Sequence, residues 1–78
     1  MIKKELENIL ATIITNGFHI QKVERLSEDN IIICTYKYDK LGAEIRYSLL
    51  FSVSAKESVL NMILSIAKRD NSKPVIVR

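Results

Sequence analysis

The sequence has 78 residues, of which 47% are apolar and 27% are charged, a composition typical of a folded globular domain. A chain this short has room for one domain, spanning residues 1–78, and buries only about 60–65% of its unfolded surface. Its single cysteine excludes an internal disulfide, and His19 and Cys34 are too few soft ligands for a structural zinc site. We therefore expect no metal and no cofactor, and stability must come from packing or self-association.

The charge balance is mildly basic, because 12 Lys and Arg residues face nine Asp and Glu residues for a formal net charge of +3. This balance permits nucleic-acid binding, although the longest basic runs are pairs such as Lys3-Lys4. Charged residues near the start interrupt any signal-peptide core, and the longest uncharged stretch, residues 8–21, is too short and polar to span a bilayer. We expect a cytoplasmic protein with no membrane partner and no small-molecule substrate.

The first half of the chain predicts one helix and two strands. Apolar residues recur at helical spacing over residues 2–16, and Gly17 closes this helix in a left-handed conformation. Residues 18–26 predict a strand with irregular alternation. A turn at residues 27–30 leads into the strongest predicted strand, residues 30–39.

Two features of the central strands predict burial on both faces. The continuous β-branched run at residues 31–33 is typical of a strand covered on both sides. After a hairpin turn at residues 39–42, the third strand places five apolar side chains on one face: Ile45, Tyr47, Leu49, Phe51 and Val53. Leu50 interrupts the opposite, polar face, so we expect that end of the strand to be covered on both sides as well.

The C-terminal third predicts a helix and a short strand. Ser54 and Glu57 form a capping box at the start of a helix over residues 55–69. Residues 71–73 predict a loop, and a short buried strand follows at residues 75–77 after a proline.

The element order, α-β-β-β-α-β, predicts a small α/β (α+β) sandwich. Its sheet would be a three-stranded antiparallel meander, extended by a fourth strand that lies parallel to the third. The two helices are expected to flank the sheet, one on each face.

Local sequence and element order together resemble a known family. The segment from Leu10 through Asn16-Gly17-Phe18 to Val23 is similar to a helix, Gly-aromatic pair and strand start of the restriction-endonuclease-like superfamily. Residues 72–77 are similar to the strand that follows the second helix of that family. The family comprises the PD-(D/E)XK nucleases, and the resemblance is to its Mrr-like and Holliday-junction-resolvase-like members.

The resemblance implies a relative without catalysis. In those nucleases, an Asp near the second strand and an acidic-x-Lys motif on the third strand hold a divalent metal that activates water. The corresponding positions here are Ile31-Ile32-Ile33 and Leu50-Phe51-Ser52. The resemblance therefore implies a degenerate nuclease-like module that binds nucleic acid and is not an enzyme.

Other residues with catalytic chemistry have simpler interpretations. Asp39, Glu44 and Arg46 fit a shifted acidic site, but a charged hairpin tip explains them as well and protects a sheet edge. Cys34 lies in an apolar strand, which favours a buried structural thiol. His19 has no nucleophile or second ligand near it in the sequence.

Nucleic-acid binding would depend on cations near loop ends. The candidates for phosphate contacts are Arg46, Lys56, Lys68, Arg69 and Lys73. Several of them must share one surface for this site to exist. Tyr36, Tyr38 and Tyr47 would stack on bases if exposed, although cross-strand packing is the simpler role for them.

The alternative function is a homodimeric protein–protein interaction domain. The apolar residues of the helix at residues 55–69 cover an arc wider than one sheet face needs. We name Leu60, Met62 and Leu64 as candidates for an interface with a second copy.

An alternative fold is the double-stranded-RNA-binding domain, which shares the order helix, meander, helix. That domain recognises duplex shape with a lysine-rich start to its second helix. Here only Lys56 stands at that point, the Gly-Pro-x-His loop of the domain is absent, and an extra strand follows.

Overall fold

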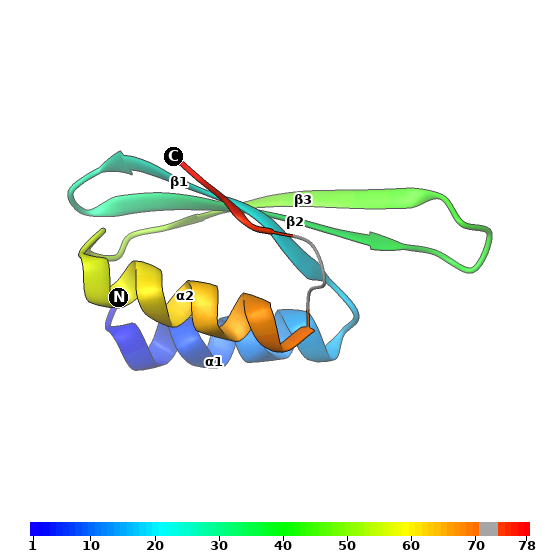
Figure 1. Cartoon of the computed structure of the whole chain (residues 1–78), viewed down its shortest axis with the longest axis horizontal. Coiled ribbons are helices and arrows are strands. Elements are labelled where there is room, and N and C mark those ends of the chain that lie inside the picture. Colours follow the sequence, from blue (N-terminus) through cyan, green and yellow to red (C-terminus); the bar gives the residue numbers. More distant parts are fainter. Residues whose placement is uncertain (71–73) are drawn as a thin grey trace.

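Two helices lie against one face of a four-stranded sheet in the computed structural model, which describes residues 1–70 and 74–78 (Figure 1). The elements are α1 (Lys3–Thr15), β1 (His19–Ser27), β2 (Asn30–Tyr38), β3 (Glu44–Phe51), α2 (Glu57–Asp70) and β4 (Ile76–Val77). The predicted element order and α/β class are therefore confirmed. The predicted loop at residues 71–73 lies outside the described residues.

The end of α1 follows the prediction from Gly17. Gly17 has a φ angle of +92°, in the left-handed region that favours glycine. Its N–H donates to the Ile14 carbonyl at 2.9 Å, and the Phe18 N–H donates to the Ile13 carbonyl at 3.2 Å. These two bonds form a Schellman motif, which satisfies the last carbonyls of the helix and turns the chain toward β1.

The irregular alternation of β1 has a structural cause. Ile20 pairs with Thr35 and Lys22 pairs with Cys34, so the register shifts between them and Gln21 is the extra residue of a β-bulge. After the bulge, the buried side chain is Val23. The bulge therefore places Lys22 on the face opposite to Ile20, whereas a regular strand would place the two residues on the same face.

The β2–β3 hairpin closes through the side chain of Asp39. Its Oδ1 accepts hydrogen bonds from the N–H groups of Leu41 and Ala43, both at 2.8 Å. Gly42 adopts a φ angle of +84° in the same turn. The predicted turn is confirmed, and the hairpin projects beyond the helices (Figure 1).

The predicted partner of the last strand is wrong. β4 lies parallel to β1, with Lys22 paired to Ile76 and Val23 paired to Val77, so the sheet order is β3-β2-β1-β4. The Arg78 N–H also donates to the Val23 carbonyl at 2.9 Å. Because α2 contacts β1, the chain that leaves α2 returns to the β1 edge. β4 is also exposed rather than buried, since it forms the edge of the sheet.

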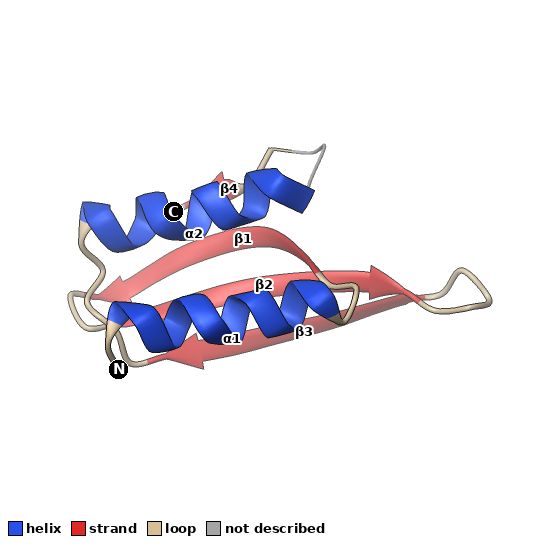
Figure 2. Cartoon of the chain, turned by 90° about the horizontal axis from the view of Figure 1, so that it is seen from below, coloured by secondary structure: helices blue, strands red, loops and turns tan. Residues whose placement is uncertain are grey.

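The predicted placement of one helix on each face is also wrong. Both helices lie on the same face of the sheet and contact each other (Figures 1 and 2). The core fills the space between this helix layer and the sheet: Leu6, Leu10, Ile20, Val23, Ile31, Ile33, Phe51, Val53, Val59, Leu60, Ile63, Ile66 and Ala67. Both helices need the same apolar sheet face, because the other face is too polar to bury a helix.

The opposite face of the sheet is left without a helix, and we call it the open face. Its side chains, assigned from the pairing register, are His19, Lys22, Glu24, Ile32, Cys34, Tyr36, Tyr38, Glu44, Arg46, Ser48, Leu50 and Ile76. The expected burial on both faces is therefore wrong: Ile31 and Ile33 are fully buried, whereas Ile32 is half-buried and Leu50 is 63% exposed.

The start of α2 differs from the predicted capping box. The helix begins at Glu57, and the Lys56 carbonyl accepts the Leu60 N–H at 3.1 Å. Ser54 therefore lies too early to be the N-cap. The adjacent Ala55 N–H instead donates to the Glu28 carbonyl at 2.8 Å, which anchors this connection to the β1–β2 turn.

Candidate nucleic-acid interface

A row of rings crosses the open face from β1 to the end of β2. The His19 and Tyr36 ring centroids are 5.3 Å apart, and those of Tyr36 and Tyr38 are 6.0 Å apart with an interplanar angle of 74°. Tyr36 and Tyr38 share this face because side chains two positions apart on a strand point the same way. Tyr36 is half-buried between His19 and Tyr38, whereas Tyr38 is 58% exposed, so Tyr38 is the more accessible of the two tyrosine rings.

Cations lie beside these rings on neighbouring strands. Arg46 of β3 is paired with Tyr36, and Lys22 of β1 lies on the same face after the bulge. The Arg46 Nε lies 3.1 Å from a Glu44 carboxylate oxygen, and the Lys22 Nζ lies 3.5 Å from a Glu24 carboxylate oxygen. The Arg46–Glu44 contact is bidentate, because Arg46 Nη2 also donates to Glu44 Oε2 at 3.3 Å. A phosphate group that binds Arg46 must therefore compete with this carboxylate, whereas the single contact of Lys22 with Glu24 contributes only about 0–1 kcal/mol.

Two adjoining hollows connect the rings with the cations. One, of about 520 Å³, is bounded on the open face by Tyr36, Tyr38 and Glu44. The other, of about 320 Å³, is bounded by Lys22, Cys34, Ser48 and Arg78. Gln21, Arg46 and Ile76 line both hollows. The two therefore form one depression across the sheet, with Tyr36 and Tyr38 toward the hairpin, Lys22 and Arg78 toward β4, and Arg46 bordering both hollows.

The cations predicted from the sequence do not gather on one surface. Lys56 precedes α2, whereas Lys68 and Arg69 lie in its last turn, about 18 Å along the helix axis. Arg46 lies on the open face, across the sheet from α2. Lys73 lies outside the described residues. Of the predicted cations that the structure describes, only Arg46 belongs to the depression on the open face.

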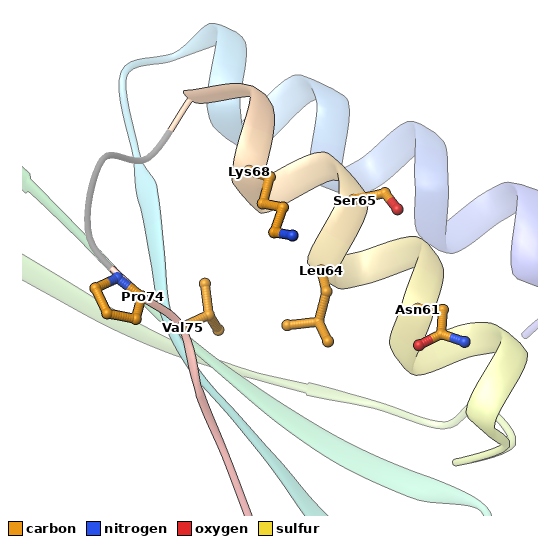
Figure 3. Close-up of a pocket in the computed structure, with 6 residues that line it drawn as sticks. All are labelled: Asn61, Leu64, Ser65, Lys68, Pro74 and Val75. Atoms are coloured by element: carbon orange, nitrogen blue, oxygen red, sulfur yellow. The ribbon is translucent and has the colours of Figure 1, made fainter.

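The predicted interface residues of α2 are mostly engaged in the core. Leu60 is only 3% exposed, and Met62 packs partly buried against the core. Leu64 is half-buried and points from α2 toward Pro74 and Val75, across a hollow of about 470 Å³ (Figure 3). The wide apolar arc of this helix is therefore explained largely by contacts within the chain.

The residues that were considered for catalysis in the sequence make contacts that stabilise the fold. Asp39 accepts the hydrogen bonds of its turn, and Glu44 pairs with Arg46. Cys34 is a free, half-buried thiol on the open face, with its Sγ atom 3.6 Å from the Ser48 Oγ atom. Within residues 1–69 and 74–78, no three His, Cys, Asp or Glu side chains come close enough to hold a metal ion. Neither of the two described helices is long and apolar enough to cross a membrane.

Sequence reasoning did not find Lys22 as a site residue, because its face depends on the bulge at Gln21. The position of Arg46 could be predicted, because the turn at residues 39–42 sets the hairpin register that pairs Arg46 with Tyr36. Comparisons with protein-family models, with curated proteins and with solved structures find no match.

Proposed function

We propose that the protein is a non-catalytic nucleic-acid-binding module whose contact surface is the open face. One observation carries the proposal: Tyr36, Tyr38 and Arg46 lie together beside a depression on a sheet face that no described helix covers. Guanidinium and ammonium groups bind phosphates, and aromatic rings accept bases by stacking. The combination favours nucleic acid over a purely apolar ligand.

The number of cations on the open face predicts a modest electrostatic contribution. Arg46, Lys22 and Arg78 border the depression, and two of them already have carboxylate neighbours. Neutralising about three phosphates predicts a slope of roughly −2 to −3 in log K against log salt concentration. Binding is therefore expected to weaken with salt, but less steeply than for a protein with an extended basic surface.

The proposed function is the one predicted from the sequence, but its contact surface is the open face and not the cations near loop ends. The non-catalytic nucleic-acid module and Arg46 are kept, whereas the cations at the ends of α2 are not part of the contact surface. A degenerate relative of the PD-(D/E)XK nucleases, with isoleucines at the metal-ligand positions 31–33, would bind nucleic acid without cleaving it.

The second candidate is the homodimeric interaction domain that uses α2. Only Met62 and Leu64 of its predicted contact residues keep any exposed surface, because Leu60 is buried. An apolar interface of this kind would be insensitive to salt, unlike phosphate contacts. Salt dependence therefore distinguishes the two functions.

The proposal is tested by fluorescence anisotropy with the whole chain. Labelled single-stranded, duplex and branched DNA and duplex RNA are titrated at about 50 mM and about 200 mM salt. Arg46→Glu is compared with Lys68→Glu, because both residues are exposed cations but only Arg46 lies on the open face. We expect Arg46→Glu to weaken binding at least about 5-fold and Lys68→Glu to change it less than about 2-fold. An absence of binding at low salt, or a larger loss for Lys68→Glu, would contradict the proposal.

A further inference from the structure

We infer that the nucleic acid bound by the open face is single-stranded, with bases stacked on Tyr36 and Tyr38 and phosphates on Arg46 and Lys22. This inference rests on the proposed function and adds the form of the ligand. It depends on three properties of the open face: the packing of its rings, the small number of its cations and its width.

The ring packing leaves aromatic surface for bases. Tyr36 and Tyr38 meet edge to face at 74°, so neither ring covers the other as a parallel stack would. Tyr38 is 58% exposed, at the end of the strand where the hairpin leaves the helices. In a duplex, the faces of the bases are occupied by their neighbours, whereas an unpaired strand can place its bases on protein rings. Stacking on these tyrosines therefore requires unpaired bases.

The cations are too few to favour a duplex. A protein that makes about 6–10 phosphate contacts binds duplex DNA with a strong electrostatic contribution, whereas three basic side chains of residues 1–69 and 74–78 border the depression. Glu24 and Glu44 lie beside two of these cations and repel further phosphates. The charged side chains thus position a single strand of nucleic acid, and base stacking must supply the remainder of the binding affinity.

The width of the face limits the length of the bound segment. Four strands about 4.8 Å apart span roughly 14 Å, and Tyr38 and Lys22 border different hollows of the depression. A single strand of nucleic acid that crosses the sheet from Tyr38 to Lys22 would place only a few nucleotides on the protein. An oligonucleotide of about eight nucleotides is therefore a sufficient probe.

The probes are fluorescein-labelled octathymidylate, octauridylate and a DNA duplex of about 16 base pairs, titrated with the whole chain at about 50 mM salt. We expect both single strands to bind at least about 5-fold more tightly than the duplex. Tyr38→Leu is compared with Tyr47→Leu, because the two rings are 58% and 55% exposed on opposite faces of the sheet. Tyr38→Leu should weaken single-strand binding about 5-fold or more, and Tyr47→Leu less than about 2-fold.

A second measurement uses the unsubstituted chain, which contains three tyrosines and no tryptophan. Stacking of bases on Tyr36 and Tyr38 should quench a large part of the tyrosine fluorescence on addition of octathymidylate. This readout needs no variant and is therefore independent of any effect of substitution on folding.

The outcomes separate this inference from the proposed function. An absence of binding to all three probes overturns both. Duplex binding equal to or tighter than single-strand binding leaves the proposed function in place and overturns the inference. Single-strand binding without tyrosine quenching, or with equal losses for Tyr38→Leu and Tyr47→Leu, likewise overturns the stacking on Tyr36 and Tyr38.

Discussion

Arg46 of β3 is the direct cross-strand partner of Tyr36 of β2, and the pairing register places both side chains on the open face. Directly opposed residues in an antiparallel pair have Cβ atoms about 4.5–5.5 Å apart. A phosphate held by Arg46 would thus lie within one nucleotide of a base stacked on the Tyr36 ring. This pair unites the electrostatic and aromatic parts of the proposed interface.

The one-sided core predicts unequal effects for two adjacent isoleucines. Ile33 is fully buried against the helices, so Ile33→Ala should lower the free energy of unfolding by about 2–5 kcal/mol. Ile32 is half-buried on the open face, so Ile32→Ala should lower the free energy of unfolding by only about 1 kcal/mol, mainly because alanine favours a strand less than isoleucine does. Urea unfolding measures both values. Equal losses would indicate that the open face is covered in solution.

Substitution of two leucines on α2 shows whether each side chain stabilises the core or is available for an interface. Leu60 is buried, so Leu60→Glu should unfold the domain, because a charge would be placed in the core without a partner. Leu64→Glu should leave the circular dichroism spectrum unchanged, because Leu64 borders an open hollow.

Sedimentation velocity of Leu64→Glu then tests the homodimer directly. If the unsubstituted chain is dimeric and Leu64→Glu is monomeric, the interaction domain on α2 is supported. We expect the substitution to leave the oligomeric state unchanged, because the wide apolar arc of α2 is used mainly within the chain.

The Asp39 turn predicts a further local effect. Asp39→Ala removes the acceptor of two backbone N–H groups and should lower the free energy of unfolding by about 1 kcal/mol. Lys40→Ala, in the same exposed turn, serves as the control and should change it by less than about 0.5 kcal/mol. Thermal unfolding measures both, and equal effects would contradict the role assigned to the Asp39 carboxylate.

How much of the fold could be predicted depends on whether each feature is set by neighbouring residues or by contacts between distant segments of the chain. The periodicity of α1, the Gly17 closure and the Asp39 turn are local, and the sequence predicted all three. The partner of β4 depends on which sheet edge α2 leaves free, and two residues, Ile76 and Val77, carry no pattern that identifies it. Alternation shows which residues share a face, but not which face the helices cover.

The same distinction applies to the candidate site. Tyr36 and Tyr38 share one face because they are two positions apart on one strand, a relation that is local in the sequence. Burial on both faces was predicted from Ile32 and Leu50 because an apolar side chain in a strand is usually covered. The cations of α2 were grouped by their proximity to loops, although opposite ends of a helix are far apart in space.

The most direct test of binding at the open face is a methyl NMR titration of isoleucine-labelled protein with octathymidylate. Ile32 and Ile76 lie on the open face, whereas Ile33 and Ile63 are buried in the core. We predict progressive shifts of the Ile32 and Ile76 methyl signals, with those of Ile33 and Ile63 nearly unchanged. Shifts confined to the isoleucines that pack around α2, or no shifts at all, would contradict binding at the open face.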